Sequence, residues 1–285
     1  MGLSANNTEK LAFSLLGFAT LTVACFVVVI LAYIILNGYS ALSIGFLTEM
    51  PRKMMTEGGI YPAIVGTLSL IIVSMAVSLP LGILAAIYLN EYAGKNRITW
   101  VIEMAINNLA GTPSVVFGLF GLALFVKYLG FGPSILSASL TLSLLIIPVI
   151  IRSSEEALIA VPKEYREASL ALGISKWKTI RHVVLPASIP GIITGSILSI
   201  GRVAGETAPI LLTGAAYFLP RLPDSIYSQF MALPYHLFVL ATAGTNIAKT
   251  RPLQYGTALV LLMIVLGVNI IAVLIRRHYR QKLKI

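Results

Sequence analysis

Six apolar stretches constrain the fold of this chain more than any other feature of its sequence. A helix needs about 20 apolar residues to cross the hydrocarbon core of a bilayer. The runs that reach or approach this length lie at about 11–36, 63–89, 104–126, 134–151, 187–212 and 256–275. With 57% hydrophobic and only 11% charged residues, the chain also departs far from the composition of a soluble domain. The sequence therefore predicts an all-α, polytopic membrane protein with six transmembrane helices.

The basic residues are distributed unequally between the loops. If the N-terminus is cytoplasmic, 14 of the 21 Lys and Arg residues lie inside, 6 lie outside, and Arg202 lies within a span. Because Lys and Arg concentrate in cytoplasmic loops, we expect a multi-pass protein of the cell (inner or plasma) membrane with both termini in the cytoplasm. The net charge of +10 sits at the ends of apolar runs, so we expect membrane lipids and no nucleic acid as partners.

Residues that carry chemistry do not assemble into a catalytic or metal site in this sequence. Cys25 is the one cysteine, which excludes an internal disulfide and a multi-cysteine zinc site. His182, His236 and His278 fall on different sides of the predicted topology, and we favour surface or interfacial positions for them over a catalytic role. The chain has no Walker A loop. We expect a non-enzymatic chain that binds no metal or cofactor and leaves any use of ATP to a partner.

One polar stretch, residues 152–186, separates the fourth and fifth runs and holds ten of the chain's 32 Asp, Glu, Lys and Arg residues. It predicts two short helices at the membrane surface, 163–172 and 176–184. The signals that delimit them are Pro162 for a first helical turn, Gly173 for a left-handed helix end, Ser175 for a cap and Pro186 for the entry to the next span. Such an elbow has a shape that fits a groove on a partner.

Arg202 and Glu206 lie within the fifth run, where a charge is costly and normally faces a bundle interior or a water-filled path. Their i, i+4 spacing places them on one helix face, together with the small residues Gly191, Gly195 and Ser199. Pro209 is expected to kink or loosen the helix near Gly205. Two interpretations stay open: an ion bridge that only fixes helix packing, and a polar path for an anion, which we favour.

The same run holds two spacings of the GxxxG type, in which small residues let a second backbone come close. These are Gly191/Gly195 and Gly201/Gly205. The third run begins with uncharged polar residues at membrane depth, namely Asn107, Asn108, Thr112 and Ser114. These four side chains either line the same path as the charged pair or form hydrogen bonds across helices.

An apolar stretch between the fifth and sixth runs, MALPYHLFVLATA, is too short to span a bilayer. Its surroundings in residues 213–255 are rich in proline. We predict that it forms an interfacial or re-entrant helix.

The polar stretch also carries a family motif. Permeases of binding-protein-dependent ABC importers share the pattern E-A-A-x3-G-x9-I-x-L-P, and this chain keeps the spacing with Ser for the third Ala and Val for Ile. The matching residues are Glu167, Ala168, Ser169, Gly173, Val183, Leu185 and Pro186. The chain thus resembles these permeases. The resemblance implies the type I (MetI-like) permease fold and a coupling helix that docks in a cleft of the ATP-binding subunit.

Four other stretches are similar to phosphate permease subunits of the PstA family: NNLAGTPSVVFGLFG, IIRSSEEALIAVP, GRVAGETAPILLTGAA and FMALPYHLFVLA. The similarity runs from about Gly58 to the basic C-terminal tail. It implies inorganic phosphate as substrate, a heterodimer with the sister permease PstC, two copies of the ATPase PstB, and the phosphate-binding protein PstS. It also implies a role in phosphate passage for Arg202 and Glu206.

On this basis we divide the chain into three parts. They are an N-terminal helix with the first outer loop (1–60), a permease domain (61–277) that contains the coupling loop 152–186, and a basic cytoplasmic tail (278–285). Alternatives are a permease for another oxyanion, such as phosphonate, sulfate or molybdate, and a channel or membrane scaffold without coupled ATP use. The spacing of the EAA motif argues against the last of these.

Overall fold

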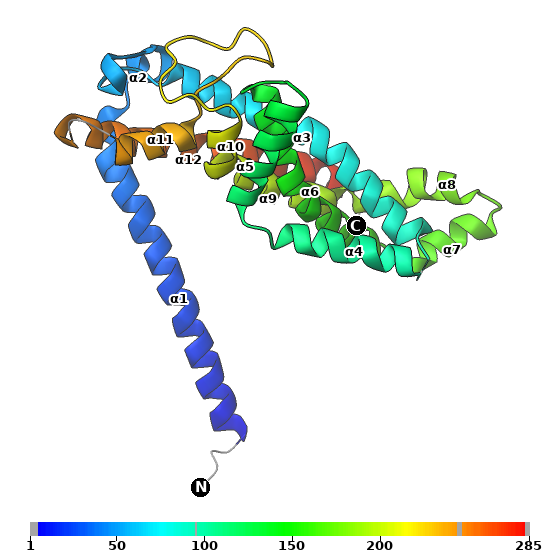
Figure 1. The fold of residues 1–285 in the computed structure, drawn as a ribbon. Coiled ribbons are helices and arrows are strands. Elements are labelled where there is room, and N and C mark those ends of the chain that lie inside the picture. The colour runs from blue at the N-terminus through cyan, green and yellow to red at the C-terminus, as the bar shows by residue number, and fades with distance from the viewer. Residues whose placement is uncertain (1–4, 95, 244–246, 283–285) are drawn as a thin grey trace.

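The computed structural model describes residues 5–94, 96–243 and 247–282, and it is mostly helical (Figure 1). The long helices are α1 (Ala5–Gly38), α3 (Tyr61–Ile87), α6 (Ile135–Ile159), α9 (Leu185–Gly205) and α12 (Ile247–Lys282). The shorter helices are α2 (Ile44–Thr48), α4 (Arg97–Ala110), α5 (Ser114–Gly121), α7 (Lys163–Ala171), α8 (Lys176–Thr179), α10 (Ala208–Thr213) and α11 (Leu233–Thr242).

Short elements of other types join these helices. The π-helical turns are η3 (Tyr88–Tyr92), η4 (Leu122–Tyr128) and η5 (Ile180–Val184), and the 3₁₀ turns are η1 (Tyr39–Ala41) and η2 (Lys53–Met55). The strands β1 (Pro51–Arg52) and β2 (Glu57–Gly58) pair as a small antiparallel hairpin. Within the described residues, five helical segments are long and apolar enough to cross a membrane, or six if one bent pair counts as a span. The prediction of a polytopic helical membrane protein is confirmed.

The third apolar run, predicted as a span at about 104–126, is the bent pair. Helix α4 and the segment Ser114–Tyr128 meet at an angle of 104°. Pro113 disfavours the helical conformation in the residue before it and is the N-cap residue of α5, so α5 starts in a new direction after the end of α4. Figure 1 shows α4 running along the bundle, whereas α5 takes a new direction and packs against α6 and α10.

The boundaries of the polar stretch also differ from the prediction. Helix α6 continues to Ile159, so residues 152–159 belong to a long helix rather than to a loop. Residues Lys176–Gly205 form one continuous helical segment, so the second short helix does not end at Val184. Because Pro186 lacks an N–H, the turn before it cannot keep regular α-helical hydrogen bonding, and it adopts the wider π form.

Helix α6 lies at the centre of the bundle, where α3 and α9 pack against it. Its buried apolar residues include Leu142, Leu145 and Ile146. Glycines on α9 allow close approach to α6, since a Cβ on Gly191 would overlap Ala157, and one on Gly195 would overlap Ser153. Moving an apolar side chain from lipid to a helix interface gives little hydrophobic free energy. Helix association in a membrane therefore depends on close van der Waals packing of this kind. The predicted role of the Gly191/Gly195 pair is thus confirmed.

Substitution at Gly195 tests this packing. Gly195→Leu is expected to destabilise the chain by about 1–3 kcal/mol, because its side chain must push α6 and α9 apart. Gly201→Leu on the same helix is the matched control, because a Cβ there meets nothing within 4 Å. Thermal unfolding of the purified chain in detergent measures both. Equal melting temperatures for the two variants would contradict the assigned contact.

Helix α11 is the short apolar helix predicted between the fifth and sixth runs, and it packs inward against α3 and α12. The backbone N–H of Leu233 donates to Oγ1 of Thr67 on α3 at 2.8 Å, and Gly66 lies against the carbonyl of Met231. His236 is 3% exposed, so the predicted surface or interfacial position is wrong for this histidine. The inward packing of a short helix is a tertiary effect that periodicity does not reveal.

The N-terminal helix lies mostly outside the helix bundle, and the predicted C-terminal tail is partly helical. Helix α1 contacts α12 near its own C-terminal end, where Gly38 lies against the backbone of Tyr255, and its remaining length stands away from the other helices (Figure 1). The predicted basic tail, 278–285, begins inside α12. Its last three residues lie outside the described part of the chain.

Candidate functional site

The charged pair of the fifth run lies at the end of α9. Nε of Arg202 lies 3.5 Å from Oε1 of Glu206, so the predicted pairing is present. Helix α9 ends at Gly205, and Glu206 has an extended backbone (φ −73°, ψ 132°) before α10 begins. This break is the one expected from Pro209, which lies in the first turn of α10.

Arg202 keeps most of its donors available. Its side chain is 36% exposed, whereas that of Glu206 is 16% exposed. A guanidinium carries five N–H donors, and within the described residues only Nε of Arg202 has a hydrogen-bond partner. The unengaged donors have the planar arrangement that suits a tetrahedral oxyanion. The pair can therefore hold an anion without first breaking an internal network.

The four uncharged candidates are placed apart from this pair. Asn107 and Asn108 are exposed near the end of α4, while Thr112 and Ser114 are half-buried at the bend before α5. Oγ1 of Thr112 donates to the carbonyl of Asn108 at 2.9 Å. In the described part of the chain, none of the four forms a hydrogen bond with the charged pair. Their place on a substrate path stays a prediction.

Asn107 instead joins α4 to α6 through Arg152, the first residue of the polar stretch. Arg152 donates from Nε and Nη2 to Oδ1 of Asn107 at 3.2 and 2.8 Å, and its Nη1 lies 2.7 Å from Oε2 of Glu155. Of the two readings for Asn107, bonding across helices is thus observed. The Arg–Glu spacing of i, i+3 in α6 was the local signal for this cluster.

The EAA residues form an elbow that projects from the bundle. Helices α7 and α8 meet near Gly173, whose φ of +76° confirms the predicted left-handed position. Ser175 precedes α8 as expected, although its side chain makes no capping hydrogen bond. Ser169, which replaces the third Ala of the motif, is buried and shares a 2.8 Å hydrogen bond with Thr179 across the elbow. This bond fixes the angle between the two helices.

The outer surface of the elbow suits a protein partner. Glu167, Ala168 and Gly173 are exposed, whereas Val183, Leu185 and Pro186 are half-buried where η5 leads into α9. Large apolar side chains also lie in the open, with Leu172 80% and Trp177 52% exposed. Contiguous exposed apolar residues outside a membrane span are typical of protein–protein contact sites.

A half-buried ion pair holds the base of the elbow against the end of α3. Arg166 of α7 donates from Nε and Nη2 to Oε1 of Glu91 in η3, at 3.1 and 2.9 Å. It also donates to the carbonyls of Val161 and Leu158 near the end of α6, at 2.8 and 2.7 Å. Lys176 donates to the carbonyl of Glu91 from the other arm. We call Glu91, Arg166 and Lys176 the clamp.

Comparison with known proteins identifies the family. The model of the family described as "Binding-protein-dependent transport system inner membrane component" matches residues 78–285. The chain belongs to this family. Its members are non-enzymatic membrane subunits of ABC importers. This agrees with the prediction from sequence that the chain is a non-enzymatic permease subunit.

Two bacterial permease proteins are similar to this chain over most of its length. A phosphate transport system permease protein PstA 1 of Mycobacterium tuberculosis (strain CDC 1551 / Oshkosh) is 38% identical over 265 residues, covering 91% of this chain and 86% of that protein. A probable ABC transporter permease protein YqgI of Bacillus subtilis (strain 168) is 36% identical over 277 residues, covering 93% and 94%. The resemblance to the PstA family is therefore confirmed.

Solved structures confirm the fold of this permease. A chain of a bacterial ABC transporter involved in the import of alginate superimposes with a TM-score of 0.64 at 14% identity, covering 96% of this chain and 99% of that one. A chain of the MetNI methionine ABC transporter in an inward-facing conformation gives 0.58 at 18% identity, covering 78% and 94%. The MetI-like fold expected from the EAA motif is the fold of this chain.

Proposed function

We propose that this chain is the permease subunit of an ATP-driven importer for inorganic phosphate in the cell (inner or plasma) membrane, with both termini in the cytoplasm. The observation that carries the proposal is the guanidinium of Arg202, which lies at the break between α9 and α10 and engages only its Nε among the residues that the structure describes. The similarity to a PstA protein over 91% of the chain supports phosphate as the anion.

The charged pair has separate tasks in this proposal. Arg202 lowers the barrier for a phosphate anion by replacing lost hydration with charge-assisted hydrogen bonds. Glu206, 3.5 Å away, limits how tightly the arginine holds the anion, so that phosphate can leave. An unopposed guanidinium would bind phosphate too strongly for turnover.

Partner subunits complete the proposed importer. A PstC-like sister permease forms the other wall of the path, since Arg202 is partly open at the surface of this chain. PstB-like ATPases bind and use the ATP, and they dock on the exposed elbow of α7 and α8 on each permease. A PstS-like protein delivers phosphate from outside. Closure of the ATPases moves α7 and switches the path from outward to inward access.

ATP-dependent uptake tests the function directly. Membrane vesicles that contain this chain with its proposed partners should accumulate radiolabelled phosphate only when ATP is supplied on the ATPase side. Excess unlabelled phosphate should compete, whereas sulfate, molybdate and phosphonate should not. Competition by one of those oxyanions would redirect the substrate assignment. Uptake without ATP would favour a channel, and failure to co-purify an ATPase would favour a membrane scaffold.

Docking at the elbow is tested at Gly173. Gly173→Glu is expected to release the ATPase subunit on co-purification, because a charged side chain would project from the exposed turn into the docking surface. A Cβ there meets nothing within 4 Å, so the chain itself should fold at a cost of about 1–2 kcal/mol for the left-handed backbone.

Gly130→Glu is the matched control for Gly173→Glu. Gly130 also has a positive φ (+71°) and open space around it, but it lies in a different loop. It should retain the ATPase. If the ATPase still co-purifies with the Gly173→Glu chain and hydrolyses ATP on demand, the docking assignment is wrong.

A further inference from the structure

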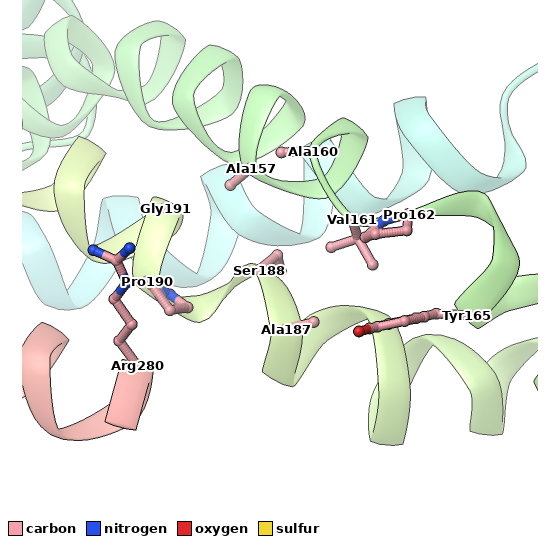
Figure 2. A pocket seen from close by; sticks show the side chains of 10 residues that line it. All are labelled: Ala157, Ala160, Val161, Pro162, Tyr165, Ala187, Ser188, Pro190, Gly191 and Arg280. Atoms are coloured by element: carbon pink, nitrogen blue, oxygen red, sulfur yellow. The ribbon is translucent and has the colours of Figure 1, made fainter. Parts of the chain in front are cut away.

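A small cavity lies where four segments meet at the base of the elbow (Figure 2). The end of α6, the start of α7, the first turns of α9 and the last turns of α12 enclose about 250 Å³. Its walls are mainly apolar and include Ala157, Ala187 and Pro190. Ligand pockets for whole small molecules have volumes of about 300–1,000 Å³, so this cavity suits part of a longer apolar molecule.

Two polar groups flank the apolar walls. Figure 2 shows Arg280 beside Pro190 and Gly191, and the ring of Tyr165 near Ala187 at the other end of the cavity. Arg280 is exposed, and in the part of the chain that the structure describes it has neither an ion pair nor a hydrogen bond. A cation thus lies beside an apolar cavity with no internal counter-charge.

The charge pattern of α12 indicates that the cavity lies at the level where the long helices leave the membrane. Nη1 of Arg276, one turn before Arg280, donates to Oγ1 of Thr194 on α9 at 3.1 Å. The apolar part of α12 precedes Arg276, and the basic cluster Arg276, Arg277 and Arg280 follows it. With the orientation proposed above, this level is the cytoplasmic face of the bilayer.

We propose that this cavity binds an anionic phospholipid of the cytoplasmic leaflet, with an acyl chain among the alanines and Pro190 and the phosphate at Arg280. The apolar walls would not hold a free phosphate ion, because it would lose hydration without gaining hydrogen bonds. An amphiphile with a negative head group satisfies both the apolar walls and the arginine. Basic pockets between helices on the cytoplasmic side bind anionic lipid head groups in this way.

Lipid photocrosslinking tests the proposal on the complex assembled with its partners in nanodiscs. The probes are phosphatidylglycerol and phosphatidylcholine that carry the same photoreactive acyl chain. We expect the phosphatidylglycerol probe to label peptides that contain residues 157–165 and 187–191, and the phosphatidylcholine probe to label them several-fold less. Arg280→Gln should lower the phosphatidylglycerol labelling about fivefold, as expected for one basic residue near an anionic surface.

Two further variants separate charge from shape. Arg277→Gln removes the same charge from the same end of α12 but not from the cavity lining, so labelling should be unchanged. Ala187→Leu fills the cavity without changing charge, and labelling by phosphatidylglycerol should fall. Neither variant changes the charged pair at the break after α9, so phosphate transport and lipid labelling can fail separately.

Three outcomes would overturn the proposal. Equal labelling by the two probes would show that the head group is not recognised. Equal labelling of the Arg280→Gln and Arg277→Gln chains would exclude Arg280 as the head-group ligand. Labelling of the isolated chain that disappears in the assembled complex would show that a protein subunit occupies the cavity instead.

Discussion

Replacing Arg202 with Gln is expected to lower phosphate uptake by about 100-fold or more while leaving the complex assembled in the membrane. Charge-assisted hydrogen bonds contribute about 1.5–3 kcal/mol each, and the substitution removes the charge and several donors from the proposed path. The chain should still fold, because Arg202 makes a single 3.5 Å contact with Glu206, and the amide of Gln can still donate to that carboxylate.

Two companion variants distinguish the proposed roles of the pair. Arg202→Lys keeps the charge but not the planar set of donors, so uptake should be intermediate. Glu206→Gln leaves the guanidinium without its counter-charge, so phosphate should bind more tightly and turn over more slowly. Initial uptake rates and phosphate affinity, measured in vesicles with equal amounts of assembled complex, report on all three variants.

The outcome also decides between the two interpretations of the pair. Normal uptake by the Arg202→Gln chain would remove it from the phosphate path. Loss of the assembled complex, with no transport defect in the fraction that remains, would show an ion bridge that only fixes packing. Loss of uptake in a complex of normal amount and stability is the result expected of a residue on the path.

The features predicted correctly from the sequence depend on local patterns. Hydropathy located the membrane-crossing segments, and the glycine with positive φ located the end of α7 to within one residue of the prediction. The i, i+4 spacing of Arg202 and Glu206 predicted their pairing, which persists although Glu206 lies just beyond the helix. Proline, glycine and charge spacing act over a few residues, so their effects can be derived without knowing the tertiary structure.

The features that were missed depend on contacts between distant segments or on competing local signals. His236 is buried because α11 folds against α3, and its own sequence surroundings do not encode that contact. Pro113 was a visible signal for the bend before α5, but the surrounding apolar run suggested a continuous span. Arg166 and Glu91 are 75 positions apart in the sequence. Counting the Lys and Arg residues of each loop therefore identifies Arg166 only as a cytoplasmic charge and does not reveal its partner.

Breaking the clamp is expected to uncouple ATP hydrolysis from uptake. Glu91→Leu should leave ATP hydrolysis near the wild-type rate but lower the phosphate imported per ATP by about tenfold, equivalent to ~1.4 kcal/mol of lost coupling. The physical reason is that Glu91 joins the end of α3 to α7, so motion of the docked elbow no longer reaches α3 when the bond is gone.

A loss of stability must be separated from this loss of coupling. Side-chain exposure is 19% for Arg166 and 9% for Glu91, and removing one partner of a buried ion pair costs about 3–5 kcal/mol. Arg166 keeps two carbonyl partners, so the low end of that range applies to Glu91→Leu. Replacing both residues with apolar ones, Glu91→Leu with Arg166→Met, should recover part of this stability, because no charge is left unpaired although two carbonyls lose the donor that Arg166 supplied.

The double variant therefore isolates the mechanical role of the clamp. If the clamp transmits motion, the double variant should be stable yet remain uncoupled, with the same low ratio of phosphate to ATP as Glu91→Leu. Glu156→Leu removes an exposed glutamate near the end of α6 and should leave the ratio unchanged. Restoration of a normal ratio together with stability would show that the ion pair only supports the fold. A persistent deficit in a stable complex would identify the contact between α3 and α7 as the route by which elbow motion reaches the membrane helices.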